Sequence, residues 1–93
     1  MQTYAVYWNE LSGARFAGRI SLGASFAELD GGSSDGRRTR ERIRFDDIAS
    51  VRYQCGRLHV WRRTGAPVRL GSFDRPGALR ELGERLQSRL AAG

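Results

Sequence analysis

The sequence contains no lysine and very little cysteine or histidine. All sixteen of its Lys and Arg positions are arginine, and it has one cysteine and one histidine. A single cysteine excludes an internal disulfide, so nothing in the sequence argues for secretion. One histidine and one cysteine are also too few to build a tetrahedral metal site of nitrogen and sulfur ligands. We therefore expect no metal and no cofactor.

Long apolar runs are missing as well. No stretch approaches the roughly eighteen consecutive apolar residues that a membrane-spanning helix requires. The first residues, MQTYAVYWNELSG, lack the basic segment and the uninterrupted apolar segment of a signal peptide. These absences lead us to expect a cytoplasmic protein.

The length and the charge of the chain set two further limits. With 93 residues the chain has room for one domain, residues 1–93, and a net charge of +6 makes that domain strongly basic. Arginine suits phosphate and carboxylate groups because its planar guanidinium binds them with two parallel hydrogen bonds. The alternative is codon bias in a GC-rich genome, and we favour it because the arginines are spread along the whole chain.

Residues from roughly 3 to 73 alternate between apolar and polar side chains with a period of two, which is typical of half-buried strands. We count about seven such segments. The apolar positions expected on the inner face of these segments are Tyr4, Val6, Trp8, Phe16, Ile20, Leu22, Ala27, Leu29, Ile43, Val51, Tyr53, Leu58, Val60, Val68 and Leu70. Gly18 predicts a bend or bulge, GGSSDG at 31–36 predicts a flexible loop, and Cys55-Gly56 predicts a tight hairpin.

The segment DGRRTRERIRF, residues 35–45, contains the densest group of arginines. Read as a strand, it places Ile43 and Phe45 on the inner face and four arginines on the outer face: Arg38, Arg40, Arg42 and Arg44. This row is a candidate anion-binding surface for nucleic acid or anionic lipid head groups. The alternative, which we favour, is a solvated outer face whose arginines also discourage edge-to-edge aggregation.

A second candidate surface lies on the segment RLHVWRR. The strand pattern places Arg57, His59, Trp61 and Arg63 together on the outer face. A tryptophan among arginines is a common composition for protein–protein hot spots. An equally good interpretation is that Trp61 packs against a neighbouring arginine by a cation–π contact.

The pattern changes to helical after residue 73. Leu79, Leu82, Leu86 and Leu90 form one apolar ridge, which predicts a helix over roughly 75–91 with Asp74 as its N-cap. The expected fold is therefore mainly β, with seven antiparallel strands followed by one C-terminal helix.

This order resembles the small bacterial pleckstrin-homology-like (PH-like) domains. The matching segments are GRISLGASFAELDG, IRFDDIASV and LHVWRRTGAPVRLGSF leading into ALRELGERL. The resemblance implies a seven-stranded barrel of two roughly orthogonal sheets, closed at one opening by the helix. The chain departs from the lipid-binding members in two respects: the loop NELSG carries no basic residue, and the helix has no tryptophan.

The resemblance implies binding or assembly rather than catalysis. We therefore expect a non-enzymatic module that contacts a protein partner or a second copy of itself, with anionic lipid or nucleic acid as the alternative partner. No small-molecule substrate is indicated. Cys55 and His59 are the only thiol and imidazole, and no third residue is placed to orient the histidine for nucleophilic catalysis.

Overall fold

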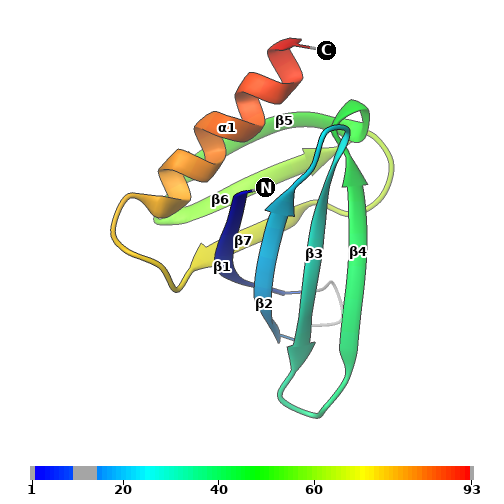
Figure 1. Cartoon of the computed structure of the whole chain (residues 1–93), viewed down its shortest axis with the longest axis vertical. Helices are drawn as coiled ribbons and strands as arrows, with labels where there is room; N and C mark the ends of the chain where they lie inside the picture. Colours follow the sequence, from blue (N-terminus) through cyan, green and yellow to red (C-terminus); the bar gives the residue numbers. More distant parts are fainter. Residues whose placement is uncertain (1, 10–14, 93) are drawn as a thin grey trace.

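The computed structural model describes residues 2–9 and 15–92. All of the loop NELSG after Asn9, whose lack of basic residues separates the chain from the lipid-binding PH-like domains, lies outside these residues. The described residues form seven strands, one short 3₁₀ helix and one α-helix (Figure 1). The elements are β1 (Gln2–Asn9), β2 (Arg15–Leu22), β3 (Phe26–Ser33), β4 (Arg38–Arg44), η1 (Phe45–Asp47), β5 (Ile48–Gln54), β6 (Arg57–Arg62), β7 (Val68–Ser72) and α1 (Ala78–Ala92).

The strands belong to one antiparallel sheet in the order β4-β3-β2-β1-β7-β6-β5. The prediction of seven antiparallel strands and a C-terminal helix is confirmed, whereas the expected division into two sheets is wrong. The reason is that β1 pairs with β2 along its whole length and also pairs with β7 through Val6, Tyr7 and Trp8. In Figure 1 the sheet changes direction around β1, so that β5, β6 and β7 run obliquely to β2, β3 and β4.

Alternation along the strands places one continuous apolar layer inside the curved sheet. The apolar positions expected on the inner face are buried, with two exceptions: Tyr53 is 43% exposed, and Phe45, which begins η1, is only partly buried against the core. Tyr53 lies near the end of β5, where its ring packs 5.1 Å from the guanidinium carbon of Arg80 on α1. The helix therefore reaches this side chain from outside the core.

Glycines permit close contact between β2 and β3. Gly18 pairs with Gly31, and a Cβ atom on Gly18 would lie only 2.1 Å from the carbonyl oxygen of Asp30. The strand registers continue through Gly18, so the residue marks a close backbone approach rather than a bulge. The predicted loop at 31–36 is also shorter than expected, because β3 extends through Ser33.

The helix begins three residues later than predicted. It starts at Ala78, after Gly77 adopts a φ of 90°. Asp74 does not cap it; instead, one carboxylate oxygen of Asp74 accepts a hydrogen bond from the backbone N–H of Ala5 at 2.9 Å. The helix thus starts after a turn that is fastened to β1.

Helix α1 packs its leucine ridge over β5, β6 and β7. Leu79, Leu82 and Leu86 are buried, and Leu90 packs against the edge of the core. Gln87 donates a side-chain hydrogen bond to the carbonyl of Val51 at 2.9 Å. Because β5 is the last strand of the sheet, this bond fastens the helix to the edge strand.

Candidate functional site

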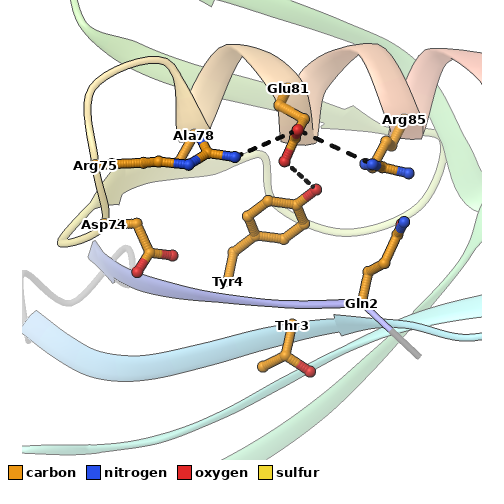
Figure 2. A pocket seen from close by; sticks show the side chains of 8 residues that line it. All are labelled: Gln2, Thr3, Tyr4, Asp74, Arg75, Ala78, Glu81 and Arg85. Atoms are coloured by element: carbon orange, nitrogen blue, oxygen red, sulfur yellow. Dashed lines mark hydrogen bonds and ion pairs between the residues drawn. The ribbon is translucent and has the colours of Figure 1, made fainter.

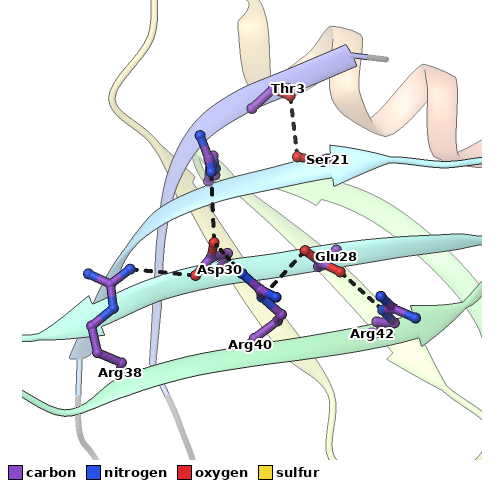
Figure 3. Close-up of polar contacts among 8 residues, drawn as sticks. Thr3, Ser21, Glu28, Asp30, Arg38, Arg40 and Arg42 are labelled. Carbon is purple, nitrogen blue, oxygen red and sulfur yellow. Dashed lines mark hydrogen bonds and ion pairs between the residues drawn. The ribbon is translucent and has the colours of Figure 1, made fainter.

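The arginine row of β4 lies on the outer face, as the alternation predicted. The exposed fractions of the four side chains run from 63% to 78%. Each arginine has a carboxylate nearby: Arg38 and Arg40 approach Asp30 at 3.7 Å, and Arg42 contacts Glu28 at 3.0 Å. Figure 3 shows these pairs bridging β3 and β4. Arg44 is paired with Asp46 at 2.9 Å.

The pairing follows from the strand register. Arg19, Asp30 and Arg40 are direct cross-strand partners on β2, β3 and β4, so opposite charges alternate across this half of the sheet. Arg42 also stacks over the ring of Phe26, with its guanidinium carbon 4.7 Å from the centroid. The positive charge of the β4 row is therefore largely balanced within the protein.

The second predicted row is only partly one surface. Arg57, His59 and Trp61 share the outer face of β6, with Trp61 47% exposed. Arg63 follows the end of β6, and its backbone N–H donates to the carbonyl of Asp47 at 2.6 Å. The structure therefore brings three of the four residues together and places Arg63 at the adjoining loop.

Two arginines that the sequence reasoning did not single out complete this surface. His59 is the direct cross-strand partner of Arg52 on β5 and of Arg69 on β7. Arg57 lies two residues before His59, so it is a diagonal neighbour of both arginines at roughly 7–8 Å. We call the surface formed by Arg52, Arg57, His59 and Arg69 the basic face.

The basic face differs from the β4 row in its lack of counter-charges. Within the part of the chain that the structure describes, no carboxylate lies within ion-pair distance of Arg52, Arg57 or Arg69. The sequence explains this difference, because residues 48–73 contain no aspartate or glutamate at all. This acid-free run is the signal from which the basic face could have been predicted.

The basic face borders a hollow of about 820 Å³. Its lining residues are Asn9, Gln54, Cys55, Arg57, His59, Pro67 and Arg69. They supply guanidinium, imidazole and amide groups, which are the side chains that bind carboxylate and phosphate oxygens. The arrangement can hold an anionic group.

Tyr7 of β1 supports one wall of this region. Its ring lies directly over Gly71, where a Cβ atom would come within 2.0 Å of the ring. The guanidinium carbon of Arg57 lies 4.8 Å from the centroid of the Tyr7 ring, and that of Arg15 lies 5.6 Å from it. The aromatic ring therefore holds Arg57 in place without neutralising its charge.

A second hollow, of about 570 Å³, lies between β1 and the start of α1. Figure 2 shows Glu81 pointing from α1 toward Tyr4, between Arg75 and Arg85. The Tyr4 hydroxyl donates to Glu81 at 2.9 Å, which lowers the pKa of the carboxyl, while burial and this bond raise the pKa of Tyr4. The charges here are paired with one another, so the contacts serve to fasten the helix to β1.

A corner between β4 and β6 contains a further ion-pair cluster. Arg62 contacts Glu41 of β4 at 2.7 Å and Asp47 of η1 at 3.0 Å, with only 17% of its side chain exposed. The Thr64 hydroxyl donates to Asp47 at 2.7 Å and lowers the pKa of that carboxyl. Arg62 thus joins β4, η1 and β6, and Asp47 also holds the loop at Thr64.

Cys55 and His59 line the same hollow, but no side-chain hydrogen bond orients His59 among the contacts of residues 2–9 and 15–90. The same residues contain no group of three or more His, Cys, Asp or Glu side chains that could hold a metal ion.

Neither the models of known protein families nor the curated proteins contain a match to this chain. In the described part of the chain, the one α-helix is too short and too polar to cross a membrane.

Proposed function

We propose that the chain is a non-enzymatic module that binds an acidic protein partner through the basic face and the adjoining Trp61. One observation carries this proposal: Arg52, Arg57 and Arg69 surround His59 with no carboxylate in ion-pair distance among the described residues. Like charges on neighbouring strands are destabilising. An external acidic group would offset that cost by pairing with them.

The basic face favours an acidic partner over a second copy of the chain. Two copies that met through this face would oppose arginine to arginine, which costs free energy at an interface. The β4 row remains an alternative anion-binding surface for lipid head groups or nucleic acid. Its arginines would first have to give up their contacts with Glu28, Asp30 and Asp46.

A PH-like barrel is the architecture that we propose for this module. Seven antiparallel strands followed by one C-terminal helix support it, as does the helix packing over β5, β6 and β7. Under this proposal the basic face lies on the outer wall of the barrel.

Binding of fluorescein-labelled poly-glutamate tests the proposed function. The double variant R57Q/R69Q removes two charges from the basic face, and R40Q/R42Q removes two charges from the β4 row, so both variants have the same net charge. We expect R57Q/R69Q to weaken binding at least about tenfold and R40Q/R42Q to weaken it about twofold or less. High salt should reduce binding of the wild-type chain.

Two outcomes would overturn the proposal. Equal losses in the two variants would mean that only net charge attracts the probe. Tighter binding of double-stranded DNA or of vesicles containing phosphatidylserine, with the same dependence on Arg57 and Arg69, would assign the face to nucleic acid or membrane instead.

A further inference from the structure

Trp61 is exposed in a way that the other exposed aromatic side chains are not. Phe73 is 63% exposed, but its ring packs 5.0 Å from that of Tyr7. Tyr53 packs against Arg80. Trp61 is 47% exposed, and among the described residues its ring contacts neither another aromatic ring nor a guanidinium group.

The strand geometry leaves the Trp61 ring uncovered. Its cross-strand partner on β5 is Ser50, a small side chain, and the register of β5 shifts between Ile48 and Ser50. Irregular positions of this kind often lie beside binding sites because they redirect neighbouring side chains. An uncovered tryptophan next to arginines is the composition of an interface hot spot.

Trp61 also lies at a defined distance from the basic face. It follows His59 by two residues on the same face of β6, a spacing of about 6.6 Å along the strand. In an extended peptide, side chains two residues apart point to the same side at the same spacing. One extended segment can therefore place an acidic side chain at the hollow and an apolar side chain on Trp61.

We infer that the outer face of β6 binds an extended peptide whose acidic side chains enter the hollow beside Arg57, His59 and Arg69 and whose apolar side chain packs on Trp61. This inference rests on the proposed function and specifies the partner as an acidic segment with an adjacent apolar residue. The charge of the face selects the acidic residues, and the unpartnered indole selects the apolar one.

The peptide contacts the sheet through side chains rather than as an added strand. Strand β6 hydrogen-bonds to β5 on one side and to β7 on the other, so it has no free edge at the basic face. Main-chain pairing, which gives affinity in strand addition, is therefore not available along β6. The free energy of binding must come from the arginines and from burial of Trp61.

Three fluorescein-labelled peptides test the inference by fluorescence polarisation with the full chain. The first is Gly-Asp-Glu-Asp-Gly-Leu-Gly, the second replaces its leucine with glycine, and the third replaces its acids with Asn and Gln. The protein variants are W61A, R57Q/R69Q and F73A. F73A is the matched control because Phe73 is an exposed aromatic side chain with a partner inside the protein.

We expect the leucine peptide to bind the wild-type chain about fivefold to tenfold tighter than the glycine peptide. In W61A this advantage should disappear, and in F73A it should remain. The neutral peptide should bind at least about tenfold more weakly than the leucine peptide. The leucine-to-glycine change tests the contact with Trp61 without altering the protein.

An equal leucine advantage in W61A and in wild type would overturn the inference, because it would mean that W61A weakens binding of both acidic peptides by the same factor. That result would leave the proposed function standing as long as the glycine peptide binds and R57Q/R69Q abolishes that binding. If neither acidic peptide depends on Arg57 and Arg69, the proposed function itself fails.

Discussion

At the residue scale, Cys55 adopts a left-handed backbone conformation that few side chains tolerate. Its φ is 52°, and that of Gly56 is 74°, so both central residues of the β5–β6 turn have positive φ. Such turns strongly favour Asn-Gly, because asparagine accepts this conformation more readily than cysteine.

We therefore predict that C55N stabilises the protein. Relief of the backbone strain should raise the free energy of unfolding by about 0.5–1 kcal/mol. Urea denaturation measures the change. C55S is the control, since serine gains nothing in this conformation and should leave the midpoint near that of wild type. A midpoint for C55N at or below that of C55S would contradict the prediction.

The sequence predicts the face on which a side chain lies where the alternation of apolar and polar residues is the only factor. The burial of Ile43 and the exposure of the four β4 arginines follow from a period of two, which the sequence displays directly. The ion-pair partners of Arg38, Arg40 and Arg42 could not be read in this way, because Glu28 and Asp30 lie on β3 and the register of that strand is a tertiary property. The prediction that Tyr53 lies inside was wrong because Tyr53 lies near the end of β5, where residues 52–56 are all exposed and its ring meets Arg80 of α1.

At the element scale, the outer surface of the sheet has two electrostatically different halves. On β2, β3 and β4 the cross-strand row Arg19–Asp30–Arg40 alternates in charge. On β5, β6 and β7 the row Arg52–His59–Arg69 contains only basic residues. The same substitution should therefore have opposite effects on stability in the two halves.

We predict that R69Q raises the free energy of unfolding by a few tenths of a kcal/mol, because it removes repulsion within the basic face. We predict that R40Q lowers it by a similar amount, because it removes an attraction to Asp30 and Glu28. Denaturation at low and high salt measures both effects, and salt should diminish each one.

A loss of stability in R69Q would argue that Arg69 has an internal counter-charge. Gain of stability together with loss of poly-glutamate binding would mark Arg69 as a residue kept for binding, since function is often retained at some cost in stability.

At the scale of the whole molecule, Arg62 joins parts of the chain that hydrogen-bonded strands do not connect. Strands β4 and β5 are the two ends of the sheet, and Arg62 reaches from β6 to Glu41 on β4 and to Asp47 between them. Because its side chain is largely buried, loss of the guanidinium leaves two carboxylates without their partner.

We predict that R62L lowers the melting temperature by about 5–10 °C. R63L, at the exposed neighbouring position, should change it by less than about 2 °C. Thermal denaturation followed by circular dichroism measures both. Similar melting temperatures for the two variants would show that the corner cluster does not hold the curved sheet together.

The pKa shifts of Asp47 and Glu81 predict a loss of stability in acid. Both pKa values are lowered in the folded chain, by the hydroxyls of Thr64 and Tyr4 respectively. The unfolded chain therefore binds more protons than the folded chain, and stability falls as the pH drops below about 4.

Urea denaturation at pH 6 and pH 3 measures this dependence. We predict that D47N and E81Q each lose stability at pH 6 and show a smaller difference between the two pH values than wild type. E84Q, which alters an exposed carboxylate of the same helix, should retain the full difference. An unchanged difference in D47N would rule out its carboxyl as a source of the acid sensitivity.

The number and the antiparallel arrangement of the strands, and the presence of the helix, could be predicted from periodicity, but the sheet as a whole could not. Whether strands form one sheet or two depends on the pairing of β1 with β7, which involves residues far apart in sequence. The basic face was half predicted, since Arg57 and His59 lie on one strand while Arg52 and Arg69 come from its neighbours.

The pairing of β1 with β7 also determines how the chain folds. Strands β1 to β4 pair as successive hairpins, as do β5 to β7, so these two groups close only short loops. Joining them requires Val6, Tyr7 and Trp8 to meet Leu70, Gly71 and Ser72, which closes a loop of most of the chain at a large entropic cost. During synthesis the edge of β1 that pairs with β7 therefore stays unpaired until β7 has left the ribosome.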